Sequence, residues 1–334
     1  MEYVTLGRSG MKVSRACLGA MNFGTDGAPC EEAEARKIID AFLDAGHNFI
    51  DTANVYTGGQ SEEVVGRAVK GKRESVVIAT KGRGPQGPGP NDSGLSRRHL
   101  TQALEASLRR LDTDYLDLYQ CHQPDPDTPI EETMATLDGF VRQGKVRYIG
   151  CSNFTGSQIV EAQWAAERIG GSPFVSLQPR YSLIARDIET DTLPAATRHG
   201  LGAIVYSPLG GGFLSGKYQR GQDPASDTRL GRSFGSPGGG ERPFNPWAAM
   251  TLTERNFDIL DEVAKVAADL GSTTTAVSLA WLLGRRGVTS VIIGPRTLGQ
   301  LEENLPGFDL ELAPDVVHRL NEVSRPPDRP RWRR

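Results

Sequence analysis

The chain has 334 residues, and its 38 basic and 41 acidic residues give a formal net charge of −3. This near balance argues against non-specific nucleic-acid binding, which requires a basic face. No run approaches the roughly 20 apolar residues that a membrane-spanning helix needs, and the N-terminus has no basic patch followed by an apolar run. We therefore expect a cytoplasmic protein that binds neither nucleic acid nor a membrane.

The four cysteines are Cys17, Cys30, Cys121 and Cys151, and no two of them form a C-x-x-C pair. A zinc site or a redox motif is therefore not expected, and we predict no bound metal. Three of the four lie in apolar runs, where a free cysteine behaves as a small hydrophobic residue. This pattern is typical of a reducing compartment.

Residues 2–13 predict a small β-hairpin that turns at residues 8–10 and caps the barrel described next. Eight short apolar runs then alternate with segments of helical periodicity. Most of the runs are continuously apolar, which is typical of parallel strands buried on both faces. Such alternation predicts an α/β protein in which eight strands close into a (β/α)8 TIM barrel. We expect strands at residues 15–19, 48–51, 76–80, 116–120, 146–150, 175–178, 203–206 and 290–294.

Helices are expected in the gaps between these strands. Ser61, followed by the acidic Glu62 and Glu63, predicts the N-terminus of the second helix. Pro129 suits the first turn of the fourth helix. We expect helices at residues 31–45, 61–70, 96–110, 129–143, 155–168, 191–199, 252–270, 273–286, 298–304 and 313–323.

Two segments interrupt this rhythm, although we expect residues 1–334 to form one barrel domain. Residues 218–247 are rich in Gly, Pro and polar residues, and they follow the seventh strand. A loop of this length predicts a lid or a cofactor-binding loop at the C-terminal rim, with a mobile surface insert as the alternative. Residues 325–334 predict a solvated basic tail.

Polar and titratable residues follow the predicted strands one after another. Asp51 ends the second strand, Tyr56 lies five residues later, Lys81 follows the third strand, and His122 follows the fourth. In a parallel barrel the carboxyl ends of all strands share one rim, where such barrels hold their active sites. The later strands lead in the same way to Ser152, Asn153, Gln178, Tyr206, Ser207, Gly294 and Arg296.

The first four of these residues suit one kind of chemistry. Tyrosine is a weak acid with an unperturbed pKa of about 10, and a nearby ammonium such as Lys81 would lower it. Asp51 would hold Lys81 charged, and His122 would position the reacting oxygen. This set suits protonation of a developing alkoxide rather than acyl transfer.

The hydride source would be a bound cofactor. A G-x-G-x-x-G match at residues 82–87 is rejected, because prolines follow it where the dinucleotide fingerprint requires a helix. Residues 294–297 precede a short helix and predict an anion site. Small residues after strand seven would admit a pyrophosphate, and Lys217 and Arg229 would add positive charge.

The chain resembles the aldo-keto reductases along nearly its whole length. The resemblance rests on FIDTANVY, VVIATKG, DLYQCHQPD, GKVRYIGCSNF, LQPRYSL, YSPLGGGFLSGKY and IIGPRTLGQLEENL, in that order. It implies a barrel fold and a catalytic tetrad of Asp51, Tyr56, Lys81 and His122, with Tyr56 as proton donor. The implied reaction is reduction of an aldehyde or ketone with NADPH, and the reverse oxidation with NADP+.

The resemblance also implies a cofactor-binding set. NADPH is favoured over NADH, because the guanidinium of Arg296 suits the extra phosphate. Ser152, Asn153 and Gln178 would hold the nicotinamide carboxamide and Tyr206 would stack on its ring; Ser207, Leu209, Gly211 and Lys217 would line the pyrophosphate path; Arg296, Thr297 and Gln300 would meet the ribose phosphate; Glu303 and Asn304 would lie near the adenine; and Met21, Asp51, Arg229 and Gly294 complete the predicted set.

Several points stay open at this stage. Phe23, Gln123 and Phe154 are candidates for the substrate pocket, but packing explains them equally well, and the carbonyl compound and oligomeric state are not specified. One alternative is a regulatory subunit like the channel-associated β-subunits of the same family, although those carry added N-terminal segments. Another is a metal-dependent hydrolase that uses Asp51, His122 and Asp125, which the single strand-end histidine disfavours.

Overall fold

The computed structural model describes residues 2–231 and 246–326. Within these residues the chain forms two compact units, each of which is treated by itself below. The single domain expected over residues 1–334 stays a prediction. The first unit comprises Met1–Pro179, Ile188–Tyr206 and Arg286–Glu302, and the second comprises Arg180–Asp187, Ser207–Arg285 and Glu303–Arg334.

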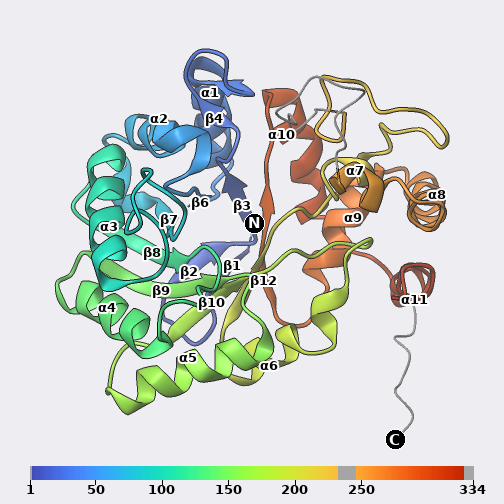
Figure 1. Cartoon of the computed structure of the whole chain (residues 1–334). Helices are drawn as coiled ribbons and strands as arrows, with labels where there is room; N and C mark the ends of the chain where they lie inside the picture. Colours follow the sequence, from blue (N-terminus) through green and yellow to red (C-terminus); the bar gives the residue numbers. More distant parts are fainter. Residues whose placement is uncertain (1, 232–245, 327–334) are drawn as a thin grey trace, which may run out of the picture. The chain divides into compact units, whose positions relative to one another are not determined.

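Eight parallel strands of the first unit close into a barrel, which confirms the predicted fold class (Figure 1). The order around the barrel is β10-β11-β12-β3-β6-β7-β8-β9. Every predicted strand is present, and each of its ends is within two residues of the expected position. The strands are β3 (Ala16–Gly19), β6 (Phe49–Asp51), β7 (Val77–Gly82), β8 (Leu116–Cys121), β9 (Val146–Ser152), β10 (Phe174–Gln178), β11 (Gly202–Val205) and β12 (Val288–Ile293).

Six helices of the first unit pack in succession around the outside of these strands (Figure 1). Their ends follow local signals: Ser96 accepts a hydrogen bond from the backbone N–H of His99, and Thr155 forms a capping box with Gln158. These helices are α1 (Glu32–Asp44), α2 (Gln60–Ala68), α3 (Arg97–Leu111), α4 (Ile130–Arg142), α5 (Gly156–Arg168) and α6 (Thr192–Arg198).

The start of α2 differs from the prediction. The residue before the helix is Gly59, with φ of 98°, and Ser61 lies in the first turn rather than capping it. The Ser61 hydroxyl donates to the carbonyl of Ala20 at 2.7 Å and lies 2.7 Å from the Thr52 hydroxyl. Ser61 and Glu62 are both buried, so these side chains fasten α2 to the barrel. The sequence predicted Ser61 as a helix cap because its contacts with Ala20 and Thr52 come from distant parts of the chain.

The predicted N-terminal hairpin is also present. β1 (Tyr3–Thr5) pairs in antiparallel fashion with β2 (Lys12–Ser14). Leu6 and Val13 of this hairpin are fully buried in a cluster with Phe49 and other barrel residues, and Gly7 packs against the backbone of Gly202, the first residue of β11. The hairpin therefore covers the barrel end opposite to the rim where the strands finish. A further two-stranded sheet, β4 (Phe23–Gly24) with β5 (Cys30–Glu31), was not predicted.

The second unit is mainly helical. The predicted loop at 218–247 is corrected at its end, because α7 begins at Pro246, while residues 232–245 and 327–334 lie outside the described residues. The helices of the second unit are α7 (Pro246–Thr251), α8 (Glu254–Asp269), α9 (Thr274–Leu283) and α11 (Pro314–Val323), while α10 (Leu298–Asn304) has residues in both units. The chain also contains the 3-10 helices Tyr56–Gly59, Arg73–Ser75, Asp187–Glu189, Phe213–Ser215 and Leu305–Phe308.

Among the described residues no single helix is long and apolar enough to cross a membrane, although α8 and α9, bent by 98°, pass that test as a pair.

Candidate active site

The carboxyl ends of the barrel strands carry the polar residues that the sequence analysis singled out. Asp51 is the last residue of β6, and His122 directly follows β8. Lys81 lies inside β7, one residue before its end, rather than after the strand as expected. Ser152 and Gln178 are the last residues of β9 and β10. These side chains therefore share one rim of the barrel.

Tyr56 is brought to this rim by a tight turn after β6. Three consecutive residues have left-handed backbones, with φ of 46° at Thr57, 67° at Gly58 and 98° at Gly59. Two glycines make this turn accessible, because glycine adopts positive φ without the steric cost that other residues meet. The Thr57 hydroxyl donates to the carbonyl of Phe23 at 2.6 Å and fixes the turn.

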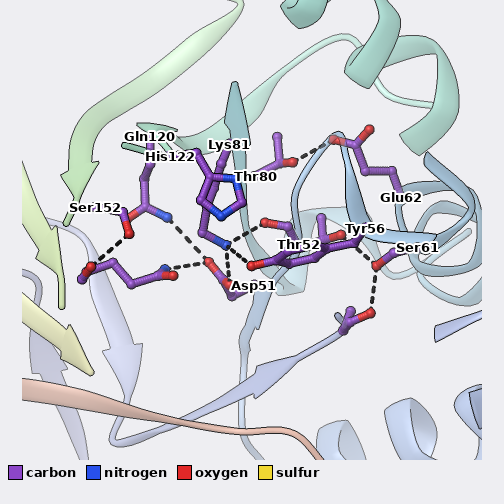
Figure 2. Close-up of polar contacts among 12 residues, drawn as sticks. Asp51, Thr52, Tyr56, Ser61, Glu62, Thr80, Lys81, Gln120, His122 and Ser152 are labelled. Atoms are coloured by element: carbon purple, nitrogen blue, oxygen red, sulfur yellow. Dashed lines mark hydrogen bonds and ion pairs between the residues drawn. The ribbon is translucent and has the colours of Figure 1, made fainter. Parts of the chain in front are cut away.

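The amine of Lys81 is the centre of the site (Figure 2). It is fully buried and donates to Asp51 Oδ1 at 2.5 Å, to the carbonyl of Thr52 at 2.8 Å and to Tyr56 Oη at 3.4 Å. Burial by itself lowers the pKa of Lys81, but the charges of Asp51 and Tyr56 and the hydrogen bonds to them outweigh burial and raise it. Lys81 therefore stays an ammonium beside the Tyr56 hydroxyl.

Asp51 is held on both of its carboxylate oxygens. Oδ1 receives Lys81, while Oδ2 accepts from Gln178 Nε2 at 2.8 Å and from Gln120 Nε2 at 3.3 Å. The whole residue is 3 % exposed. A buried carboxylate is tolerated when it is paired and hydrogen-bonded in this way. The Asp51 carboxylate is thus held by three side chains, Lys81, Gln178 and Gln120.

His122 contacts the ring of the tyrosine. The His122 and Tyr56 rings meet edge to face, with centroids 5.6 Å apart and planes at 83°. Burial, together with the positive charges of Lys81 and Arg83, lowers the pKa of His122 to about 3. The imidazole is therefore neutral near pH 7, and a neutral imidazole both donates and accepts hydrogen bonds.

These four side chains can serve as a proton-donating site. The Tyr56 hydroxyl lies beside the Lys81 ammonium, and the Tyr56 ring contacts a neutral imidazole, so an oxygen held between Tyr56 and His122 can accept a proton and a hydrogen bond. No serine or cysteine nucleophile belongs to this cluster of four, so the arrangement does not suit acyl transfer.

The residues expected to hold a nicotinamide form a connected network on the same rim. Ser152 Oγ donates to the carbonyl of Gln178 at 2.8 Å. Asn153 Nδ2 donates to Ser152 Oγ at 3.0 Å and to the carbonyl of His122 at 3.1 Å. Tyr206 Oη donates to Asn153 Oδ1 at 2.9 Å. Through Gln178 this network reaches the buried carboxylate of the proton-donating cluster.

The predicted anion site before α10 is partly occupied by the chain itself. The backbone N–H of Arg296 donates to Gln300 Oε1 at 2.8 Å, and that of Leu298 donates to Glu34 Oε1 at 2.8 Å. The Thr297 hydroxyl accepts from the backbone N–H of Gln300 at 3.3 Å. A phosphate would therefore be met here by the side chains of Arg296 and Thr297. The other two predicted cofactor residues of this unit are Met21, after β3, and Gly294, after β12.

In the second unit a glycine-rich turn follows Ser207 and Leu209. The glycines 210–212 all have left-handed backbones, with φ of 56°, 71° and 86°. A Cβ at the third of them would lie 2.6 Å from Lys217 Nζ, and one at the second would lie 3.5 Å from Arg229 Cδ. The side chains of Lys217 and Arg229 therefore lie next to glycine backbone that has no side chain of its own. The remaining predicted cofactor residues of this unit are Glu303, which accepts from Thr275 Oγ1 at 2.9 Å, and Asn304, which is 7 % exposed.

The three candidate substrate residues lie in different surroundings. Gln123 lines a cavity together with His122. Phe23 is fully buried, and Phe154 packs edge to face on Phe174 with ring centroids 5.8 Å apart. Their substrate roles stay predictions.

Some site residues were missed from the sequence. Gln120 was counted as part of an apolar strand, although a glutamine two residues before His122 in such a run was a usable signal. Arg83 was passed over because the glycines on both sides marked a loop. That loop reading itself is correct, since no helix begins between Gly82 and α3.

A metal site was the third possibility raised by the sequence. Among residues 2–231 and 246–326, no three His, Cys, Asp or Glu side chains are grouped so that they could hold a metal ion. Asp51 is paired with Lys81, and Asp125 accepts from the backbone N–H of Leu95 and from the Thr128 hydroxyl, both at 2.7 Å. The residues considered for a metal are thus engaged in other contacts.

Comparison with known proteins bears on the whole chain. The model of the Aldo/keto reductase family matches residues 15–325. An uncharacterized oxidoreductase, YrpG, of Bacillus subtilis is 39 % identical over 97 % of this chain and 96 % of its own length. A probable voltage-gated potassium channel subunit beta of Arabidopsis thaliana is 38 % identical over the same shares. The aldo-keto reductase dtxS3 of Metarhizium robertsii is 35 % identical over 98 % of this chain and 92 % of its own.

Proposed function

The chain belongs to the aldo/keto reductase family, and on that premise we propose that it reduces an aldehyde or a ketone to an alcohol with NADPH. Family membership supports an oxidoreductase that acts on a small carbonyl compound. The observation that carries the finer proposal is the buried Lys81 ammonium, which contacts both Asp51 and the Tyr56 hydroxyl. A tyrosine in that position is suited to give up a proton.

Each member of the cluster has a separate task in this proposal. Tyr56 donates its proton to the carbonyl oxygen as negative charge develops there. Lys81 stabilises the phenolate that remains, and Asp51 keeps Lys81 charged and in place. His122, being neutral, holds the carbonyl oxygen by a hydrogen bond. In the reverse direction the same groups remove the proton of an alcohol.

The proposed cofactor is consistent with residues of each unit. When bound, NADPH would supply the hydride that the carbonyl carbon receives. In the first unit, the amides of Asn153 and Gln178 would bind the carboxamide, and Arg296 would bind the phosphate on the ribose, which favours NADPH over NADH. In the second unit, Lys217 and the turn at 210–212 would bind a diphosphate, because uncovered backbone beside a cation suits an anion.

The proposal includes a cytoplasmic location. All four cysteines are free and buried, and none is paired with another. Free cysteines persist most readily in a reducing compartment.

Turnover with a panel of carbonyl compounds tests this function. NADPH oxidation would be followed with aldehydes, ketones, quinones and sugars, for the parent protein and for Tyr56→Phe. We expect the parent to turn over at least one class, and Tyr56→Phe to bind NADPH normally but react far more slowly. Tight NADPH binding without oxidation by either protein, across the whole panel, would overturn the proposal.

The likeness to probable potassium channel β-subunits supports a second candidate, a cofactor-binding regulatory subunit. This role predicts slow turnover and tight retention of cofactor after purification. The rate of cofactor release, compared with the rate of carbonyl reduction, separates the two candidates. Slow reduction of every panel compound, together with slow release of the cofactor, favours the regulatory role, whereas fast reduction of at least one compound favours the reductase.

A further inference from the structure

A cavity opens directly beside the proton-donating cluster. Its volume is about 550 Å³, and His122 forms part of its wall. Val55 and Gly58, which flank Tyr56 in the sequence, also line it. A cavity of this size, next to the residue proposed to hold the carbonyl oxygen, is suited to the rest of a small substrate.

One wall of this cavity carries a cation. Arg83 lines the cavity, and its Nε atom is buried without a hydrogen-bond partner. Within the described part of the chain, no acidic side chain forms an ion pair with Arg83. The charge of Arg83 acts on the carboxylate of Asp125 without forming an ion pair with it. Asp125 already accepts hydrogen bonds from the backbone N–H of Leu95 and from the Thr128 hydroxyl. The guanidinium is therefore available to a ligand.

A second polar side chain that lines the same cavity makes no hydrogen bond. Asn54 is 1 % exposed, and neither its Nδ2 nor its Oδ1 has a partner. Burying an amide without hydrogen bonds is unfavourable, so such a group calls for an explanation. A ligand in the cavity that Asn54 lines would supply the missing partner.

The backbone around Arg83 is built to hold it in this place. Arg83 has φ of 136°, a region that favours glycine, although glycine stands on both sides of it. Those glycines are required by packing: a Cβ at Gly82 would collide with Tyr119 Oη, and one at Gly84 with Val55. The Arg83 carbonyl accepts from the backbone N–H of Gly94 at 2.9 Å. Backbone strain of this kind gathers at functional sites.

We propose that the substrate is a carbonyl compound that also carries an oxyanion, a carboxylate or a phosphate, which Arg83 binds with the help of Asn54. The guanidinium suits both groups, because its parallel N–H donors match two oxygens at once. The carbonyl group then lies toward Tyr56 and His122, and the anion toward Arg83. This inference rests on the proposed function, since it assigns the far end of the same substrate.

Matched substrate pairs test the inference by kinetics. The carboxylate arm compares 4-carboxybenzaldehyde with its methyl ester, and the phosphate arm compares glyceraldehyde 3-phosphate with glyceraldehyde. We expect kcat/KM to favour at least one anion over its neutral partner by tenfold or more. Arg83→Gln should remove that preference, because kcat/KM should fall at least tenfold more for the anion than for its neutral partner, whereas Arg83→Lys should keep part of the preference.

The control variant is Arg98→Gln, which removes one exposed arginine of α3 outside this cavity. It should leave both members of each pair unchanged. Equal losses on charged and neutral compounds in Arg83→Gln, or a parent protein that prefers neither anion, would overturn the inference.

Binding without turnover separates this inference from the proposed function. Benzoate, inorganic phosphate and the neutral benzamide would be titrated calorimetrically into the parent and Arg83→Gln proteins. We expect benzoate or phosphate, but not benzamide, to lose at least tenfold in affinity in Arg83→Gln. If that loss occurs while no carbonyl compound is reduced, the function fails and the anion site stands. If carbonyl compounds are reduced but no anion binds through Arg83, the function stands and the anion site fails.

Discussion

Two buried carboxylates lie on either side of strand β7, and their surroundings are similar (Figure 2). Asp51 is 3 % exposed and Glu62 is 0 % exposed. Asp51 pairs with Lys81 at 2.5 Å, and Glu62 pairs with the Nε of Arg110 at 2.7 Å. Glu62 also accepts from the Thr80 hydroxyl at 2.5 Å. Burial and pairing therefore do not distinguish a site residue from a structural one.

The two pairs differ in the further contact of the cation: Lys81 also contacts the Tyr56 hydroxyl, whereas Arg110 lies on α3. Thr80 and Lys81 are consecutive residues of β7, so their side chains point to opposite faces of the barrel wall. Lys81 points inward and contacts the Tyr56 hydroxyl, while Thr80 points outward to Glu62 on α2. Arg110 belongs to α3 on the outside of the barrel. We therefore assign chemistry to the inner pair and anchoring of α2 to the outer pair.

The largest expected effect follows from breaking the inner pair. Lys81→Met removes the ammonium and leaves Asp51 buried without a cation. We expect a loss of about 3–5 kcal/mol in the free energy of unfolding, together with a fall in kcat of about a hundredfold or more. Urea denaturation and NADPH oxidation measure the two losses on the same preparation.

A double variant provides the control for this prediction. Asp51→Asn combined with Lys81→Met removes both charges, so much of the stability should return while activity stays low. If Lys81→Met alone kept turnover within about threefold of the parent, Lys81 would not support the proton donor.

The outer pair should give the opposite pattern. Glu62→Gln removes the charge that Arg110 faces, and we expect a loss of about 2 kcal/mol in the free energy of unfolding. The kcat of the folded protein should stay close to that of the parent. Glu63→Gln is the matched control, because the Glu63 side chain is 44 % exposed, and its loss should be about 0.5 kcal/mol or less. Equal losses in the two variants would contradict the anchoring role.

The sequence predicts residues that are marked by their position at the end of a strand, but it does not predict contacts between residues far apart in the chain. Asp51, Lys81 and His122 were singled out because each ends or follows an apolar run predicted as a strand, and a parallel barrel brings all such ends to one rim. Glu62 was interpreted as helix N-terminal chemistry, because an acidic residue in a first turn has the same local pattern whether or not it contacts the barrel. Gln120 was missed because its partner, Asp51, lies 69 residues away in the chain.

A smaller effect concerns the pH dependence of stability. The pKa of His122 is lowered to about 3 in the folded protein from an ordinary value of 6.5. Between these values the unfolded chain binds more protons than the folded one, so the free energy of unfolding falls as the pH falls below 6.5. We expect His122→Asn to flatten this slope by about 1 kcal/mol per pH unit. Parallel curves for the two proteins would contradict a neutral His122.

A modest effect on cofactor binding is expected at a charge away from both pairs. Arg296→Ala should weaken NADPH binding by about tenfold, which corresponds to about 1.4 kcal/mol, because the ribose phosphate loses its guanidinium. NADH lacks that phosphate, so its binding should change by no more than about twofold. Cofactor titration followed by fluorescence measures both values. Equal affinities in the variant and the parent for both cofactors would refute the role of Arg296.

The most direct test of the central claim is the rate of a single turnover. The best carbonyl compound of the panel would be mixed with an excess of protein saturated with NADPH, for the parent, Tyr56→Phe and Glu62→Gln. If the inner pair supports proton donation by Tyr56, Tyr56→Phe should react about a thousandfold more slowly, while Glu62→Gln should react like the parent. A rate for Tyr56→Phe within about threefold of the parent, with NADPH still bound, would contradict the account.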